Sequence, residues 1–99
     1  MKETIYEYQT RSGTYKVWLE KNTYANGREA LLLMDKNGQV ACATVNLADE
    51  PLGHREVFIK TWSENEFMLP FLIKNNLVTD TGKEVQTGHV KARVVILRV

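Results

Sequence analysis

Residues 57–77, VFIKTWSENEFMLPFLIKNNL, constrain the fold more than any other stretch of this chain. The part that ends at Trp62 is rich in β-branched and aromatic residues, which predicts a strand. Ser63 and Glu66 then form the S-x-x-E pattern of a capping box, in which each side chain accepts a hydrogen bond from the other residue's backbone N–H. The segment therefore predicts a strand that runs into a helix over about 64–75.

The predicted helix contains one residue that disturbs it and ends at a recognisable stop. Pro70 has no N–H to donate, and its ring clashes with the preceding turn, so we expect a kink or a short 3₁₀ segment before Phe71. Asn75 and Asn76 tolerate the backbone conformations in which helices end.

The rest of the chain is typical of short strands separated by turns. Apolar and polar residues alternate over 14–21, which predicts a half-buried strand. The KNG sequence at 36–38 predicts a hairpin, whose second strand covers 39–46. Residues 78–88 predict two short strands around a turn at Thr81-Gly82. The whole of 1–99 is then one α+β domain with a mostly antiparallel sheet of six to seven strands, curved or barrel-like, and one helix packed on it.

Charge and hydropathy set the class of protein. Lys and Arg number 13 against 12 Asp and Glu, so a net charge of +1 gives no argument for a nucleic-acid or membrane-surface protein. The charge is uneven, because residues 49–66 hold five acidic and two basic side chains. Neither a signal-peptide h-region nor a run of about 20 apolar residues is present in the sequence, so we expect a cytoplasmic protein that does not cross a membrane.

Residues that could carry catalysis do not converge in the sequence. Cys42 is the single cysteine and lies among apolar residues, which favours a buried thiol. His54 and His89 lack metal-ligand spacing to each other or to other ligand types, and no nucleophile or phosphate-binding motif occurs. We therefore predict no catalytic residue, no metal site, no cofactor and no enzymatic activity.

Two groups of residues are candidates for binding. Asp49 and Glu50 lie in an irregular loop, and Glu64 and Asn65 lie at the expected helix start, where they offer an acidic contact surface to a protein partner. A carboxylate site for Mg²⁺ is the weaker interpretation, since the macrodipole already favours Glu64 in a first helical turn. Trp18 is either a packing residue or an exposed anchor.

An aromatic anchor would suit single-stranded nucleic acid, together with other aromatic and basic side chains; the candidates are Trp18, Trp62, Tyr6, Tyr8, Tyr15, Tyr24, Lys16, Lys60, Lys91 and Arg93.

Several segments resemble a family of small proteins of unknown function that is found in bacteriophages, prophages and conjugative elements. The resemblance runs from about Tyr15 onward, and the segments are VWLEKNTYANGREALLLMD, ATVNLADEPL, EVFIKTWSENEFM and TGKEVQTGHVKARVVIL. Phe67 and Pro70 depart from the family pattern at the helix start. The resemblance implies no activity. It implies an accessory protein of a mobile genetic element that acts by binding a macromolecule, with antagonism of a host protein as one form and single-stranded nucleic-acid binding as the alternative.

Overall fold

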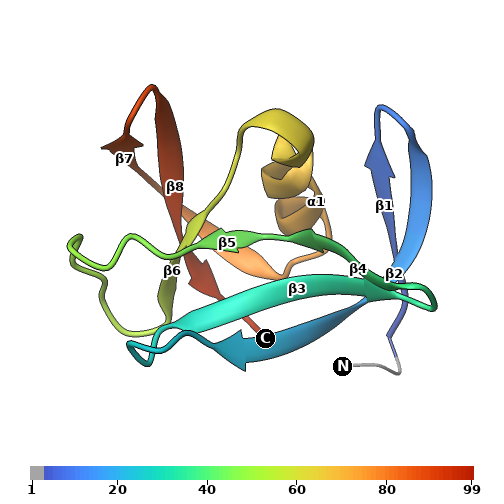
Figure 1. Ribbon diagram of the computed structural model, residues 1–99, viewed down its shortest axis with the longest axis horizontal. Coiled ribbons are helices and arrows are strands. Elements are labelled where there is room, and N and C mark those ends of the chain that lie inside the picture. Colours follow the sequence, from blue (N-terminus) through green and yellow to red (C-terminus); the bar gives the residue numbers. More distant parts are fainter. Residues whose placement is uncertain (1–3) are drawn as a thin grey trace.

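The computed structural model describes residues 4–99, and these form two four-stranded antiparallel sheets with one α-helix between their upper ends (Figure 1). The first sheet has the order β1 (Tyr6–Thr10), β2 (Gly13–Thr23), β3 (Glu29–Asp35), β4 (Gly38–Cys42), and the second has the order β5 (Thr44–Val45), β6 (Glu56–Ile59), β8 (Val90–Leu97), β7 (Val78–Thr87). The α+β class and the antiparallel pairing are confirmed. The prediction of one sheet with six or seven strands is wrong, and the strands do not close into a barrel.

Strand β2 is long because it serves two neighbours in turn. Its first half, Gly13–Val17, pairs with β1, and its second half, Trp18–Thr23, pairs with β3. The predicted alternation holds: Val17 and Leu19 are buried in the core, while Lys16 and Glu20 are exposed.

The chain passes from one sheet to the other at Ala43, which interrupts the single strand expected over 39–46. The Ala43 N–H donates to the carbonyl of Leu31 at 2.9 Å, and the Ala43 carbonyl accepts from the N–H of Lys60 at 2.9 Å. Ala43 is fully buried, so its small side chain fits where the two sheets meet. One residue therefore hydrogen-bonds to both sheets.

The capping box predicted at Ser63 and Glu66 is wrong. Ser63 has a φ of +55°, and neither helical segment that begins here has a side-chain cap. The helix predicted over 64–75 is instead a 3₁₀ turn, η1 (Ser63–Asn65), followed by a shorter helix, α1 (Met68–Lys74). A helical interruption was expected near Pro70, but it lies earlier, between η1 and α1.

Pro70 is the third residue of α1, so it lies in the first turn, where backbone N–H groups have no intrahelical acceptor. The first helical bond runs from the Phe71 N–H to the Phe67 carbonyl at 3.2 Å. Pro70 therefore removes no hydrogen bond from α1 and favours the helix start at this place.

The end of α1 at Asn75 and Asn76 is confirmed. Asn76 has a φ of +57°, its N–H donates to the Ile73 carbonyl at 3.1 Å, and the Leu77 N–H donates to the Leu72 carbonyl at 2.9 Å. These two bonds make a Schellman motif, with Asn76 in the left-handed position.

Helix α1 packs its apolar face into the core that the sheets share. Phe71 contacts the rings of Tyr6 and Tyr8 edge-on, with centroids 6.3 and 5.1 Å apart, and Leu72 is fully buried. No helix within residues 4–99 is long and apolar enough to cross a membrane.

The turn predicted at Thr81-Gly82 is wrong. The register between β7 and β8 shifts between Asp80 and Glu84, so residues 81–83 form a bulge within a single strand. Gly82 has a φ of +80°, and the Thr81 hydroxyl donates to the Val94 carbonyl at 2.6 Å.

Candidate functional site

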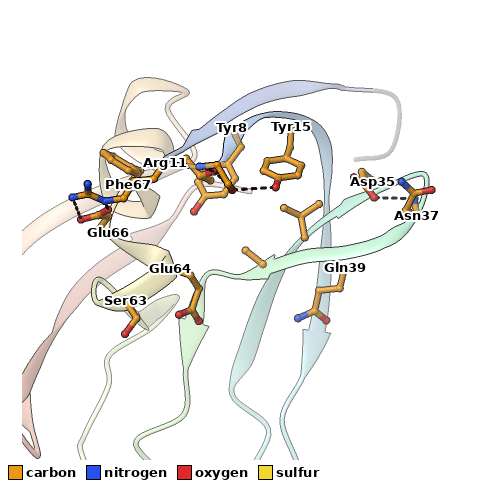
Figure 2. Close-up of a pocket in the computed structure, with 14 residues that line it drawn as sticks. Tyr8, Arg11, Tyr15, Asp35, Asn37, Gln39, Ser63, Glu64, Glu66 and Phe67 are labelled. Carbon is orange, nitrogen blue, oxygen red and sulfur yellow. Dashed lines mark hydrogen bonds and ion pairs between the residues drawn. The ribbon is translucent and has the colours of Figure 1, made fainter.

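A cleft of about 850 Å³ opens at one end of the first sheet (Figure 2). Its walls are the β1–β2 turn, the β3–β4 hairpin and the η1 turn with the two residues after it; the lining residues are Tyr8, Thr10, Arg11, Ser12, Tyr15, Asp35, Asn37, Gln39, Val40, Ala41, Ser63, Glu64, Glu66 and Phe67. The volume lies within the range of about 300–1,000 Å³ that is typical of ligand sites. The cleft is therefore the leading candidate for a binding site.

Tyr8 contributes a hydroxyl that the fold does not use. The residue is 1% exposed, and its hydroxyl oxygen has no hydrogen-bond partner among residues 4–99. Leaving such a group unpaired costs about 1–3 kcal/mol, and most buried polar groups in folded proteins are paired. An unpaired hydroxyl beside a cleft is therefore a group that a ligand could satisfy.

The negative charge of Glu64 acts on the Tyr8 hydroxyl. Burial raises the pKa of Tyr8, and the charge of Glu64 raises it further, so Tyr8 stays neutral and can both donate and accept. In Figure 2, Tyr8 and Glu64 lie on facing sides of the cleft. Glu64 itself accepts a hydrogen bond from the Lys60 ammonium at 2.7 Å, which lowers the pKa of its carboxyl group.

An ion pair between Arg11 and Glu66 closes one side of the cleft (Figure 2). Arg11 Nε and Nη2 donate to the two oxygens of the Glu66 carboxylate, the second at 3.2 Å, and this bond lowers the pKa of Glu66. The Arg11 guanidinium also lies 6.0 Å from the centre of the Phe67 ring. The pair ties the β1–β2 turn to the segment between η1 and α1.

Asn65 holds the η1 part of the cleft wall in place. It is 2% exposed, and its side-chain N–H donates to the Cys42 carbonyl at the end of β4 at 2.7 Å. This bond holds η1 against the first sheet and so positions Ser63 and Glu64 at the cleft. Asn65 was predicted as a contact residue, but in this conformation it lies in the interior.

Strand β4 is an edge strand of the first sheet, and its residues Gln39, Val40 and Ala41 line the cleft. Ala41 pairs with Leu33 and Gln39 pairs with Met34, so Val40 is an extra residue that makes a bulge. Bulges disturb the regular backbone pattern that an added strand needs, and Asn65 already occupies the Cys42 carbonyl. The cleft is thus better suited to recognise side chains than to add a strand.

The other predicted binding residues lie elsewhere. Asp49 is exposed, and the loop that carries it is held by Arg28, which donates to the backbone carbonyls of Leu47, at 2.7 Å, and Glu50. Trp18 is half-buried, and its indole N–H donates to the Glu20 carboxylate at 3.3 Å. Of the five predicted residues, Glu64 alone lines the cleft.

Local sequence patterns did not point to most of the cleft residues. Tyr8 and Tyr15 were considered only as aromatic anchors for nucleic acid, and Arg11, Asp35 and Gln39 were not considered at all. One signal was available: in an antiparallel meander the first and third turns lie at the same end of the sheet. The β1–β2 turn at residues 11–12 and the KNG turn at 36–38 could therefore have been placed at one end of the sheet.

Cys42 and the histidines take no part in the cleft. The Cys42 thiol donates to the Thr44 carbonyl at 3.3 Å, and Thr44 in turn pairs with the Tyr24 hydroxyl at 2.9 Å, behind β4. Within residues 4–99, no three His, Cys, Asp or Glu side chains gather as metal ligands would.

Comparison with protein-family models, curated proteins and solved structures finds no match to this chain. The resemblance to proteins of mobile elements stays a prediction, so a proposal on function depends on the geometry of the cleft.

Proposed function

We propose that this chain is a non-enzymatic binding protein that takes a segment of a partner protein into the cleft. The observation that carries the proposal is the Tyr8 hydroxyl, which is buried and unpaired within residues 4–99 and belongs to the cleft wall. Around it lie an apolar floor from Val40 and Ala41 and polar groups from Gln39 and Glu64. Nine of the fourteen lining residues are polar or charged, so the cleft would hold a ligand mainly through hydrogen bonds and charge.

Binding is favoured over catalysis by how the cleft hydroxyls are engaged. The Ser12 hydroxyl lies 3.3 Å from the Tyr15 hydroxyl and 3.0 Å from the Thr10 hydroxyl. A serine nucleophile needs a neighbouring base to remove its proton, and neither neighbour of Ser12 is a base. These hydroxyls therefore serve as hydrogen-bonding groups in the proposed function.

A protein partner is favoured over nucleic acid by charge and by topology. The cleft lining has three carboxylates, those of Asp35, Glu64 and Glu66, and one cation, Arg11, while Lys60 pairs with Glu64 from outside the lining. The remaining excess of negative charge repels phosphate. The nucleic-acid hypothesis also needs Trp18 beside the basic residues of β8, but β2 and β8 belong to different sheets (Figure 1).

The biological setting is proposed from the sequence resemblance alone. It is that of a cytoplasmic accessory protein of a mobile genetic element, which would act by occupying a host protein. The acidic residues of the cleft fit a basic segment of such a partner.

Selection of short peptides from a random display library tests the proposal. The bait is the full chain, and the selected peptides are then measured on two variants. Gln39→Trp places a large side chain in the cleft, whereas Gln86→Trp places the same side chain at an exposed position of β7 in the other sheet. We expect the selected peptides to lose at least tenfold in affinity on Gln39→Trp and to bind Gln86→Trp like the original chain.

Two results would contradict the proposal. One is a library that yields no peptide above background, and the other is a set of peptides that bind both variants equally well. A labelled oligothymidine is titrated in parallel at low salt; saturable binding that Gln39→Trp removes would favour the nucleic-acid alternative instead.

A further inference from the structure

We propose that the group recognised in the cleft is a cationic side chain of the partner, specifically the guanidinium of an arginine, held between the Tyr8 hydroxyl and the Glu64 carboxylate. This inference rests on the proposed function, and it adds the chemistry of the ligand. It depends on three observations: the charge of the cleft, the unpaired hydroxyl and the position of Lys60.

The charges that line the cleft are unbalanced. Arg11 and Glu66 pair with each other, which leaves the carboxylates of Asp35 and Glu64 without a cation among the lining residues. Asp35 accepts from the backbone N–H of Asn37 at 2.8 Å, so one of its oxygens is engaged in the β3–β4 turn (Figure 2). A cation that enters the cleft is therefore attracted by both carboxylates.

The Tyr8 hydroxyl oxygen is covered in the empty cleft, and it gives the cation a second acceptor once the side chains that cover it move aside. The neutral phenol has two oxygen lone pairs, and neither accepts a hydrogen bond from a residue within 4–99. A guanidinium has five N–H donors in a planar fork, so it can donate to a carboxylate and to a neighbouring hydroxyl at once, and it stacks well on aromatic rings. Tyr15 lies beside Tyr8 in Figure 2 and offers such a ring.

Glu64 already pairs with a cation of this chain, Lys60, which is not among the cleft-lining residues. Its ammonium lies 2.7 Å from Glu64 Oε1, in a pair in which the Glu64 side chain is 67% exposed. An exposed pair of this kind is weak, and one carboxylate can accept about four hydrogen bonds. The entering guanidinium therefore shares Glu64 with Lys60 or displaces it.

Three capped tripeptides test this inference on the full chain: Gly-Arg-Gly, Gly-Lys-Gly and Gly-citrulline-Gly. Citrulline has the shape of arginine without its charge. Binding is followed by the amide chemical shifts of the labelled protein at low salt. We expect the arginine peptide to shift amides around Tyr8, Gln39 and Glu64, the lysine peptide to bind about threefold more weakly, and the citrulline peptide to bind at least tenfold more weakly.

Three variants separate recognition from folding. Glu64→Gln should weaken the arginine peptide about three- to fivefold, as expected for an exposed ion pair, whereas Glu84→Gln, at an exposed glutamate on β7, should leave it unchanged. Tyr8→Phe should weaken it about threefold or more without lowering the urea midpoint, because the lost hydroxyl made no bond within the fold. Lys60→Met should tighten binding about twofold, because it removes the competing cation; a purely structural role of Glu64 predicts no such gain.

Equal binding of the citrulline and arginine peptides would overturn the inference, as would unchanged binding on Glu64→Gln. Failure here is distinguishable from failure of the proposed function. Library peptides that require an open cleft but contain no basic residue would refute the arginine inference alone. Library peptides that ignore Gln39→Trp would refute both.

Discussion

Removal of the Asn65 side chain should destabilise the protein, because η1 loses its hydrogen bond to the end of β4. In Asn65→Ala the Cys42 carbonyl loses the donor that now lies 2.7 Å away, in a place where Asn65 is 2% exposed and water cannot easily substitute. An unsatisfied buried acceptor costs about 1–3 kcal/mol, and the lost side-chain packing adds to that figure. We expect the free energy of unfolding to fall by about 2–3 kcal/mol.

Urea unfolding followed by tryptophan fluorescence measures this change, and a thermal melt should show a fall in midpoint of about 10 °C for a domain of this size. Asn22→Ala is the matched control, because Asn22 is an exposed asparagine on β2. We expect that control to change stability by less than about 0.5 kcal/mol. If Asn65→Ala melted like Asn22→Ala, the bond from η1 to β4 would not be what holds this wall.

Asn65→Asp gives an independent test of the same bond through its dependence on pH. A carboxylate at this buried place faces the Cys42 carbonyl, and both burial and that carbonyl disfavour the charged form. The pKa of the new carboxyl should therefore be higher in the folded state than in the unfolded chain. The deficit relative to the original protein should be smallest at about pH 3–4 and should grow as pH rises through the raised folded value.

Three further predictions concern the segments that frame the cleft. Ser63→Gly should raise the free energy of unfolding by about 0.5 kcal/mol in urea melts, because Ser63 has a positive φ. Ser63→Ala should change it by less than about 0.5 kcal/mol. A loss of about 1 kcal/mol in Ser63→Ala would show that the Ser63 side chain does cap the helix. At Asn76, Gly should be neutral or stabilising and Ala should cost about 1 kcal/mol, and equal midpoints would contradict the Schellman end of α1. The hydrogen bond from Arg11 lowers the pKa of Glu66 below its ordinary 4.5, so the stability that this pair gives is present above pH 4.5 and is lost as pH falls below it. The difference in urea midpoint between the original protein and Glu66→Gln should therefore shrink as pH falls below 4.5. A difference that stays constant with pH would contradict the ion pair.

The strands could be predicted because each carries its pattern locally. Residues 29–35 have apolar side chains on both faces, which is typical of a central strand, and they form β3; the KNG turn at 36–38 joins β3 to β4 as predicted. The end of α1 at Asn76 could also be predicted, since few residue types accept a positive φ. In each case the residues that decide the structure are neighbours in sequence.

The division into two sheets could not be predicted, because it depends on contacts between distant residues. Ala43 lies in the run VACATV, which is typical of one continuous strand. Its N–H and carbonyl bond to Leu31 and to Lys60, 12 and 17 residues away in the sequence. Periodicity describes which face a side chain occupies, and it does not describe which strand its backbone bonds to.

The capping box failed for a related reason. The S-x-x-E pattern at Ser63 and Glu66 is a genuine local preference, worth about 1 kcal/mol. In the structure Glu66 bonds to Arg11, 55 residues away, and Asn65 bonds to Cys42, 23 residues away. These two long-range bonds replace the reciprocal cap and pull the chain into a 3₁₀ turn with Ser63 in a left-handed conformation.

The same two bonds explain why the cleft exists where the sequence showed only a helix start. A regular helix from Ser63 would direct Glu64 and Asn65 along its own first turn, as the capping box predicts. The 3₁₀ turn instead buries Asn65 against β4 and leaves Glu64 at the cleft, on the side that faces Tyr8 (Figure 2). The departure from the local pattern therefore creates the acidic wall of the proposed site. This agrees with the general observation that natural sequences break local rules most often at functional places, and it makes η1 the segment in which changes of stability and changes of binding should separate most clearly.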